Sequence, residues 1–159
     1  MFGNNDNFEI NKLKVGYTFT YNKTDWKIIE IGEYYWKTGE SSTEYTIVDD
    51  LNRTAFLEVE LYKGDFELYF SEETVMDKNT INEALENEEL VYMSNDYELD
   101  ESYEGSYKSI TNKSARERLT SHVFYHKKRM FTIEEWNEDT QVFYGEEIKV
   151  KHIKNIKSN

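Results

Sequence analysis

Paired carboxylates are the first residues in this sequence whose type and spacing could support catalysis. Glu58 and Glu60 stand two positions apart in the segment TAFLEVE. In an extended strand they share one face at a separation of about 7 Å, which is compatible with the carboxylate pair of a glycoside hydrolase. The same pattern arises when one side of a strand faces water, because Leu57, Val59 and Leu61 then take the other side. We interpret the two acids as a solvated strand face.

Histidine is the other residue type that could hold a metal or transfer protons. His122 and His126 are four positions apart in the segment SHVFYH. A helix would place them one turn apart, as zinc motifs require, whereas a strand places both on the face of Phe124. The β-prone neighbours favour the strand, and His152 could complete a three-histidine site only if the fold brought it close. We interpret these histidines as ordinary strand residues and expect no metal or other cofactor.

Aromatic side chains offer a third kind of chemistry. Tyr34, Tyr35 and Trp36 precede the loop segment KTGESS. Such side chains stack on sugar rings or anchor partner proteins. The three residues are therefore a candidate binding surface.

Several catalytic classes are excluded by what the sequence lacks. The chain has no cysteine, so it has no thiol nucleophile and no thiolate metal site. It also lacks a Gly-x-Ser-x-Gly motif and a glycine-rich phosphate loop. We therefore predict that the protein is not an enzyme.

The elements that must position these residues are mostly β-strands. Short period-two or fully apolar runs are broken by turn residues every eight to twelve positions, and 16% of the 159 residues are aromatic. One helix is predicted where Thr80 and Glu83 have capping-box spacing before INEALENEE. We expect nine or ten strands and one short helix in a mostly-β fold of antiparallel sheets.

The second half of the chain echoes the first at an offset of about 75 residues. FELYFSEETV matches TQVFYGEEIKV, and EYTIVDDLNRTAFLEVE parallels SHVFYHKKRMFTIEEW. The echo predicts a duplicated β-meander that forms a sandwich or a partly open barrel. We expect a disordered N-terminus at 1–7 and a single domain at 8–156, with repeat halves 8–75 and 105–156 joined by an acidic segment at 76–104.

The echo also pairs two acids. Glu58 and its counterpart Glu134 occupy matching places beside bulky apolar residues. Both are structural if they are buried and bonded to backbone, whereas a shared pocket would make them a site. With His122 and His126 they are the weaker site candidates.

Charge limits the range of partners. The net charge of −13 argues against nucleic-acid binding, and 83–104 contains nine acids and no lysine or arginine. This segment is either a solvated connection or an acidic face for a basic partner. The sequence shows neither a membrane-spanning run nor a signal peptide, so we expect a cytoplasmic protein without membrane insertion.

Particular residues in the first half resemble a known family. The features are Leu13, Gly16, Trp26, Glu44, Tyr45, Leu57 and Glu58, and the C-terminal half adds Ile133, Glu134 and Gly145. Together they resemble the bacterial domain of unknown function 4178 family over residues 11 to 156, with Phe56 in place of that family's usual Trp. The resemblance implies a compact β-rich domain with no established activity. It also implies an accessory role, because genes of that family lie near membrane-stress and polyamine-synthesis genes.

We therefore expect a non-enzymatic interaction or accessory module. Its partner is expected to be a basic or membrane-associated protein, and its oligomeric state is left open. The alternative is a small-molecule or carbohydrate-binding domain that uses an aromatic surface.

Overall fold

One antiparallel sheet of eleven strands organises residues 8–159, which are the residues described by a computed structural model. The disorder expected for residues 1–7 lies outside the described residues. The strands are β1 (Thr18–Tyr21), β2 (Thr24–Trp36), β3 (Ser41–Val48), β4 (Thr54–Tyr62), β5 (Asp65–Thr74), β6 (Glu89–Tyr92), β7 (Asn95–Ser109), β8 (Glu117–His126), β9 (Arg129–Trp136), β10 (Thr140–Ile148) and β11 (Lys154–Lys157). The helical elements are η1 (Ile10–Lys12), α1 (Lys78–Asn87) and η2 (Val150–His152).

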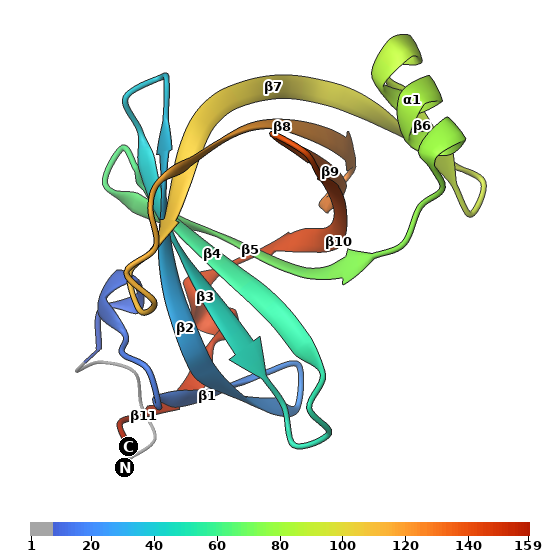
Figure 1. The fold of residues 1–159 in the computed structure, drawn as a ribbon. Coiled ribbons are helices and arrows are strands. Elements are labelled where there is room, and N and C mark those ends of the chain that lie inside the picture. The colour runs from blue at the N-terminus through green and yellow to red at the C-terminus, as the bar shows by residue number, and fades with distance from the viewer. Residues whose placement is uncertain (1–7) are drawn as a thin grey trace.

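Eight of these strands close into a ring. They run β2, β3, β4, β5, β10, β9, β8, β7 and back to β2 (Figure 1). The closing contact pairs residues 32–36 of β2 with 105–109 of β7. Two glycines permit this contact, because a Cβ on Gly32 would strike the ring of Tyr107 and one on Gly105 would strike Trp36. The fold is therefore a closed ring of strands, and not a sandwich.

The mostly-β prediction is confirmed, with differences in detail. There are eleven strands in the described residues, where nine or ten were expected. The acidic segment 76–104 is more than a connection, because it contains α1, β6 and most of β7, which is a ring strand. Acidic strands of this kind escape detection because their solvent-facing positions hide the apolar alternation.

Corresponding strands of the two halves are separated by about the same number of residues as the repeated segments in the sequence. β8, β9 and β10 begin 76, 75 and 75 residues after β3, β4 and β5. The two meanders join edge to edge, through β5 and β10, and they do not stack face to face.

The apolar cores lie on the side of the strands that faces away from the ring interior. Tyr45, Ile47 and Leu57 belong to a core between β2–β5 and the elements β1, β11 and η1. Phe124 and Phe131 belong to a second core beneath α1 and β6. Because successive side chains alternate in a strand, the residues between these apolar positions point into the ring.

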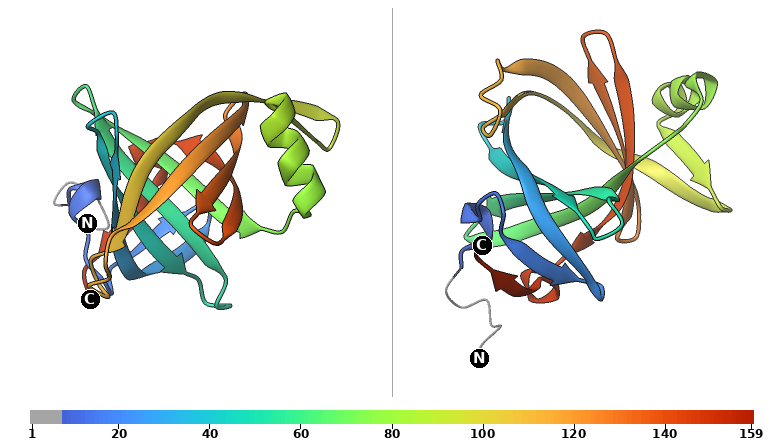
Figure 2. Two further views of the ribbon diagram at one scale, coloured as in Figure 1. Left: turned by 45° about the horizontal axis from the view of Figure 1, so that its top comes forward. Right: turned by 60° about the horizontal axis from the view of Figure 1, so that its bottom comes forward.

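Helix α1 lies outside the ring, beside β6 (Figures 1 and 2). It begins one turn before the predicted capping residue, because Asp77 is the N-cap and accepts a hydrogen bond from the backbone N–H of Thr80 at 2.8 Å. Thr80 was therefore wrong as the cap. Among residues 8–159, no helix has the length and apolar character needed to cross a membrane.

Candidate ligand-binding site

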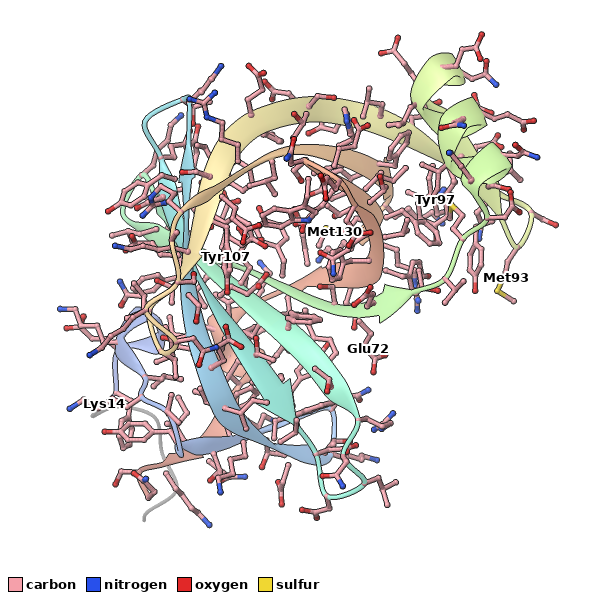
Figure 3. All side chains as sticks on the ribbon, in the orientation of Figure 1. Lys14, Glu72, Met93, Tyr97, Tyr107 and Met130 are labelled. Carbon is pink, nitrogen blue, oxygen red and sulfur yellow. The ribbon has the colours of Figure 1, made fainter. Side chains whose placement is uncertain are left out.

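The ring interior contains a cavity of about 380 Å³. Its walls come from six ring strands and from the β2–β3 loop, and Figure 3 shows the side chains that fill this part of the molecule, with Met130 labelled. The lining residues are Trp36, Thr38, Glu40, Glu58, Glu60, Tyr62, Glu67, Tyr69, Glu101, Tyr103, Ser121, Val123, Tyr125, Met130, Thr132 and Glu134. A cavity of this size suits a small organic molecule.

The lining is acidic and aromatic. It includes six glutamates, four tyrosines and one tryptophan, and no lysine, arginine or histidine. Carboxylates without nearby cations repel one another, and this repulsion grows as water is excluded. The cavity is therefore electrostatically complementary to a positively charged molecule.

Two acids form the inner part of the cavity. The Ser42 hydroxyl donates a hydrogen bond of 2.6 Å to Glu58 Oε2. Glu134 is only 7% exposed and lies opposite Ser121 in the β8–β9 pair. Ser121 is 4% exposed and also lines the cavity. The inner cavity therefore combines two carboxyls with the hydroxyl of Ser121.

A tyrosine connects this inner part to a third acid. The Tyr34 hydroxyl lies 3.2 Å from Glu44 Oε2 and 3.4 Å from Glu134 Oε2. Tyr34 is held in place by Trp36, whose ring stacks on it almost in parallel at a centroid distance of 5.1 Å. The buried hydroxyl therefore bridges carboxyls from β3 and β9.

A second group of acids lies one step farther along the strands. Glu60 follows Glu58 on the same face of β4, about 7 Å along the strand. It pairs with Glu67 across β4 and β5, and Glu40 from the β2–β3 loop also approaches it. The cavity therefore carries an inner and an outer tier of carboxyls.

Burial changes the ionisation of these acids. Removal from water raises the pKa of Glu134 to about 8, with a further contribution from the charge of Glu58. Burial also raises the pKa of Glu58, although the Ser42 hydrogen bond opposes this effect, and raises that of Glu44 well above its ordinary value. The pKa of Glu60 rises to about 8 through burial and its contact with Glu40. Each carboxyl lacks a cation that would stabilise its charged form.

Of the predicted site residues, the structure brings Glu58 and Glu134 together. Both line the cavity. The interpretation of Glu58 and Glu60 as a solvated strand face is wrong, because both acids point into the cavity. The strand alternation separates the aromatic group, because Tyr34 is buried, Trp36 lines the cavity and Tyr35 lies exposed on the outer face. A shared binding surface of these three aromatic residues stays a prediction.

His122 and His126 lie on the outer face of β8, whereas His152 lies in η2. His122 contacts Ser102 Oγ and Glu135 Oε1, each at 2.6 Å, and His126 Nδ1 lies 3.1 Å from the Asp96 carbonyl oxygen. Neither residue lines the cavity. Within residues 8–159, no three His, Cys, Asp or Glu side chains are grouped to hold a metal ion.

Sequence reasoning missed several lining residues. Glu67 and Tyr69 stand two apart on β5, and Glu101 and Tyr103 do so on β7. An acid and a tyrosine at period two therefore share a strand face. This repeated Glu-x-Tyr spacing was the available signal for an acidic aromatic interior.

The family comparison agrees with the resemblance seen in the sequence. The family described as Domain of unknown function (DUF4178) matches residues 14–150. The chain belongs to this family. No curated protein and no solved structure matches the chain.

The DUF4178 resemblance and the cavity involve some of the same residues. Glu44, Glu58 and Glu134 are among the positions that carry the resemblance, and all three meet around the inner tier and the Tyr34 hydroxyl. Tyr45, Leu57 and Ile133 point the opposite way, into the apolar cores. The alternation therefore places family positions on both the core face and the cavity face.

Proposed function

We propose that this protein binds a small organic cation with two or more amino groups inside the ring of strands. The observation that supports this most strongly is the composition of the cavity, with six glutamates and no basic residue in its lining. This role corresponds to the small-molecule alternative expected from the sequence.

The two tiers suit a linear diamine. One ammonium group binds Glu58 and Glu134, and donates a hydrogen bond to the hydroxyl oxygen of Ser121. A second ammonium group, about 7 Å away along the strand direction, binds Glu60 in the outer tier. The methylene chain between them lies against aromatic walls, where Trp36 also provides a cation–π surface. A neutral sugar would leave the buried carboxyls without compensation.

The expected contribution of each carboxyl is measurable. A hydrogen bond to a charged group contributes about 1.5 to 3 kcal/mol, which corresponds to a change of about tenfold to a hundredfold in the dissociation constant. Replacing one carboxyl of each tier should therefore weaken binding in separate, detectable steps.

Isothermal titration calorimetry with putrescine tests the proposal. We expect one putrescine per chain, weaker binding of butylamine and ethylenediamine, and no binding of glucose. Glu58→Gln should lower putrescine affinity by at least about tenfold, while Glu138→Gln, an exposed residue in the β9–β10 turn, should leave it unchanged. Equal effects of the two substitutions, or no heat with any amine, would contradict the proposal.

A role as an interaction module is a second proposal, supported by a different part of the molecule. The β6–β7 hairpin projects beyond the ring, with Met93 labelled at its tip (Figure 3). Val91 and Met93 are 62% and 78% exposed, and the neighbouring Glu86 and Glu89 are also exposed. Such a surface suits a basic partner strand. An oligolysine peptide should bind less tightly to a Glu86→Gln/Glu89→Gln variant and equally well to Glu58→Gln, whereas the reverse pattern would contradict this role.

A further inference from the structure

The bridge between Glu44, Tyr34 and Glu134 is short of protons when both acids are ionised. The Tyr34 hydroxyl has one proton, and it lies within hydrogen-bond distance of a carboxyl oxygen on each side. It can donate to one carboxylate only. The other carboxyl completes the chain if it is protonated, because it then donates to the Tyr34 oxygen.

The surroundings favour such a retained proton. The groups that act on this bridge are Glu30 on β2, Glu58 on β4, Glu73 on β5 and Tyr107 on β7. Each is an acid or a phenol, so each disfavours a second negative charge on the bridge. Ser121, from β8, is neutral and does not supply a compensating charge.

We infer that the cavity exchanges a proton for its ligand, so that binding of the amine releases at least one proton from the bridge formed by Glu44, Tyr34 and Glu134. This inference rests on the proposed function. The proton leaves the O–H bond of a carboxyl and passes to solvent, and the ligand ammonium replaces it as the positive partner of the carboxylate. The exchange forms and breaks no other covalent bond.

The ionisation of the acids supports the same direction. Burial raises the pKa of Glu134 to about 8, so this carboxyl is mostly protonated at neutral pH in the empty cavity. A bound ammonium group opposes that shift because it stabilises the carboxylate. Aliphatic amines resemble lysine and stay charged below about pH 10. The apparent affinity should therefore rise with pH, by up to tenfold per pH unit for each proton released, and level off above about pH 8.

Calorimetry in buffers of different ionisation enthalpy measures the exchanged proton directly. Putrescine should release about one to two protons per bound molecule at neutral pH, because the pKa of Glu60 in the outer tier is raised as well as that of Glu134. Glu134→Gln should release fewer, while Glu138→Gln should match the wild-type value. Putrescine binding without proton release would overturn the exchange and leave the proposed function intact. Absence of binding would overturn both.

Tyr34→Phe separates proton exchange from a merely structural effect. The Tyr34 hydrogen bond lowers the pKa of Glu44 and Glu134, so its removal should move the pH at which affinity levels off to higher values. The matched control is Tyr35→Phe, which changes the exposed outer neighbour. An equal loss of affinity at every pH would show that Tyr34 only supports the fold. Carboxyl carbon NMR of the folded variants supplies an independent readout. The raised pKa values of Glu44, Glu60 and Glu134 mean that their signals should titrate well above the ordinary range, and the Glu134 signal should ionise when putrescine is added.

Discussion

Replacing Glu134 by glutamine should remove a large loss of folding stability that the wild-type protein shows as the pH rises. The wild-type carboxyl has its pKa raised from 4.5 to about 8 by burial and by the charge of Glu58. The native state therefore binds a proton more tightly than the unfolded chain does. Its contribution to stability is fully present below about pH 4.5 and is lost as the pH rises to about 8.

The magnitude follows from the size of the shift. At about 1.4 kcal/mol per pKa unit, the change from 4.5 to about 8 corresponds to an upper value of about 5 kcal/mol. This is a large part of the total stability of a domain, which is about 5 to 15 kcal/mol. A neutral glutamine has no such dependence, so Glu134→Gln should be more stable than the wild type above about pH 8 and similar to it near pH 4.5.

Urea unfolding at a series of pH values measures this effect. The difference in unfolding free energy between Glu134→Gln and the wild type should grow as the pH rises from about 4.5 to about 8 and then level off, because the pKa of the Glu134 carboxyl lies near the upper limit. Glu138→Gln should follow the wild-type curve. A constant offset between Glu134→Gln and the wild type across the whole range would refute the view that a buried, unpaired carboxyl faces the cavity.

Three further substitutions test the fold and the cavity walls. Gly145→Ala should destabilise the protein by several kcal/mol in urea unfolding, because its Cβ would strike the backbone of β5 and separate it from β10. Asp77→Ala should cost about 1 kcal/mol, measured in the same way, because the backbone N–H of Thr80 loses its capping partner. Trp36→Ala should weaken putrescine binding by about fivefold to thirtyfold in calorimetry through loss of the cation–π surface, and Tyr35→Ala should not.

The strands of this fold are visible in the sequence because alternation is a local signal. The pattern around Glu58 correctly placed Leu57 and Val59 together in a buried core. It could not show that the opposite face is enclosed, because that depends on pairing between β2 and β7, which are about 70 residues apart. Acidic residues on one face of a strand normally indicate that this face is exposed to solvent, whereas here they line a cavity. The same pattern placed Leu61 on the face of Leu57 and Val59, but Leu61 is 56% exposed because β4 extends past the core.

The cavity could be foreseen only in part. The echo related Glu58 to Glu134 and raised the idea of a shared pocket, which the structure contains. Glu44 stood out only as part of the family resemblance and Ser121 gave no signal, because each resembles an ordinary polar strand residue. Their significance comes from hydrogen bonds and burial that only the closed ring creates.

The central claim, that an organic diamine binds inside the ring, can be tested most directly through the indole N–H signals of the tryptophans. Trp36 lines the cavity, whereas Trp26 lies in the apolar core on the other side of the wall. On titration with putrescine, the Trp36 signal should shift and saturate while the Trp26 signal stays in place. An unmoved Trp36 signal at saturating putrescine, or equal small shifts of both signals, would contradict binding in the cavity.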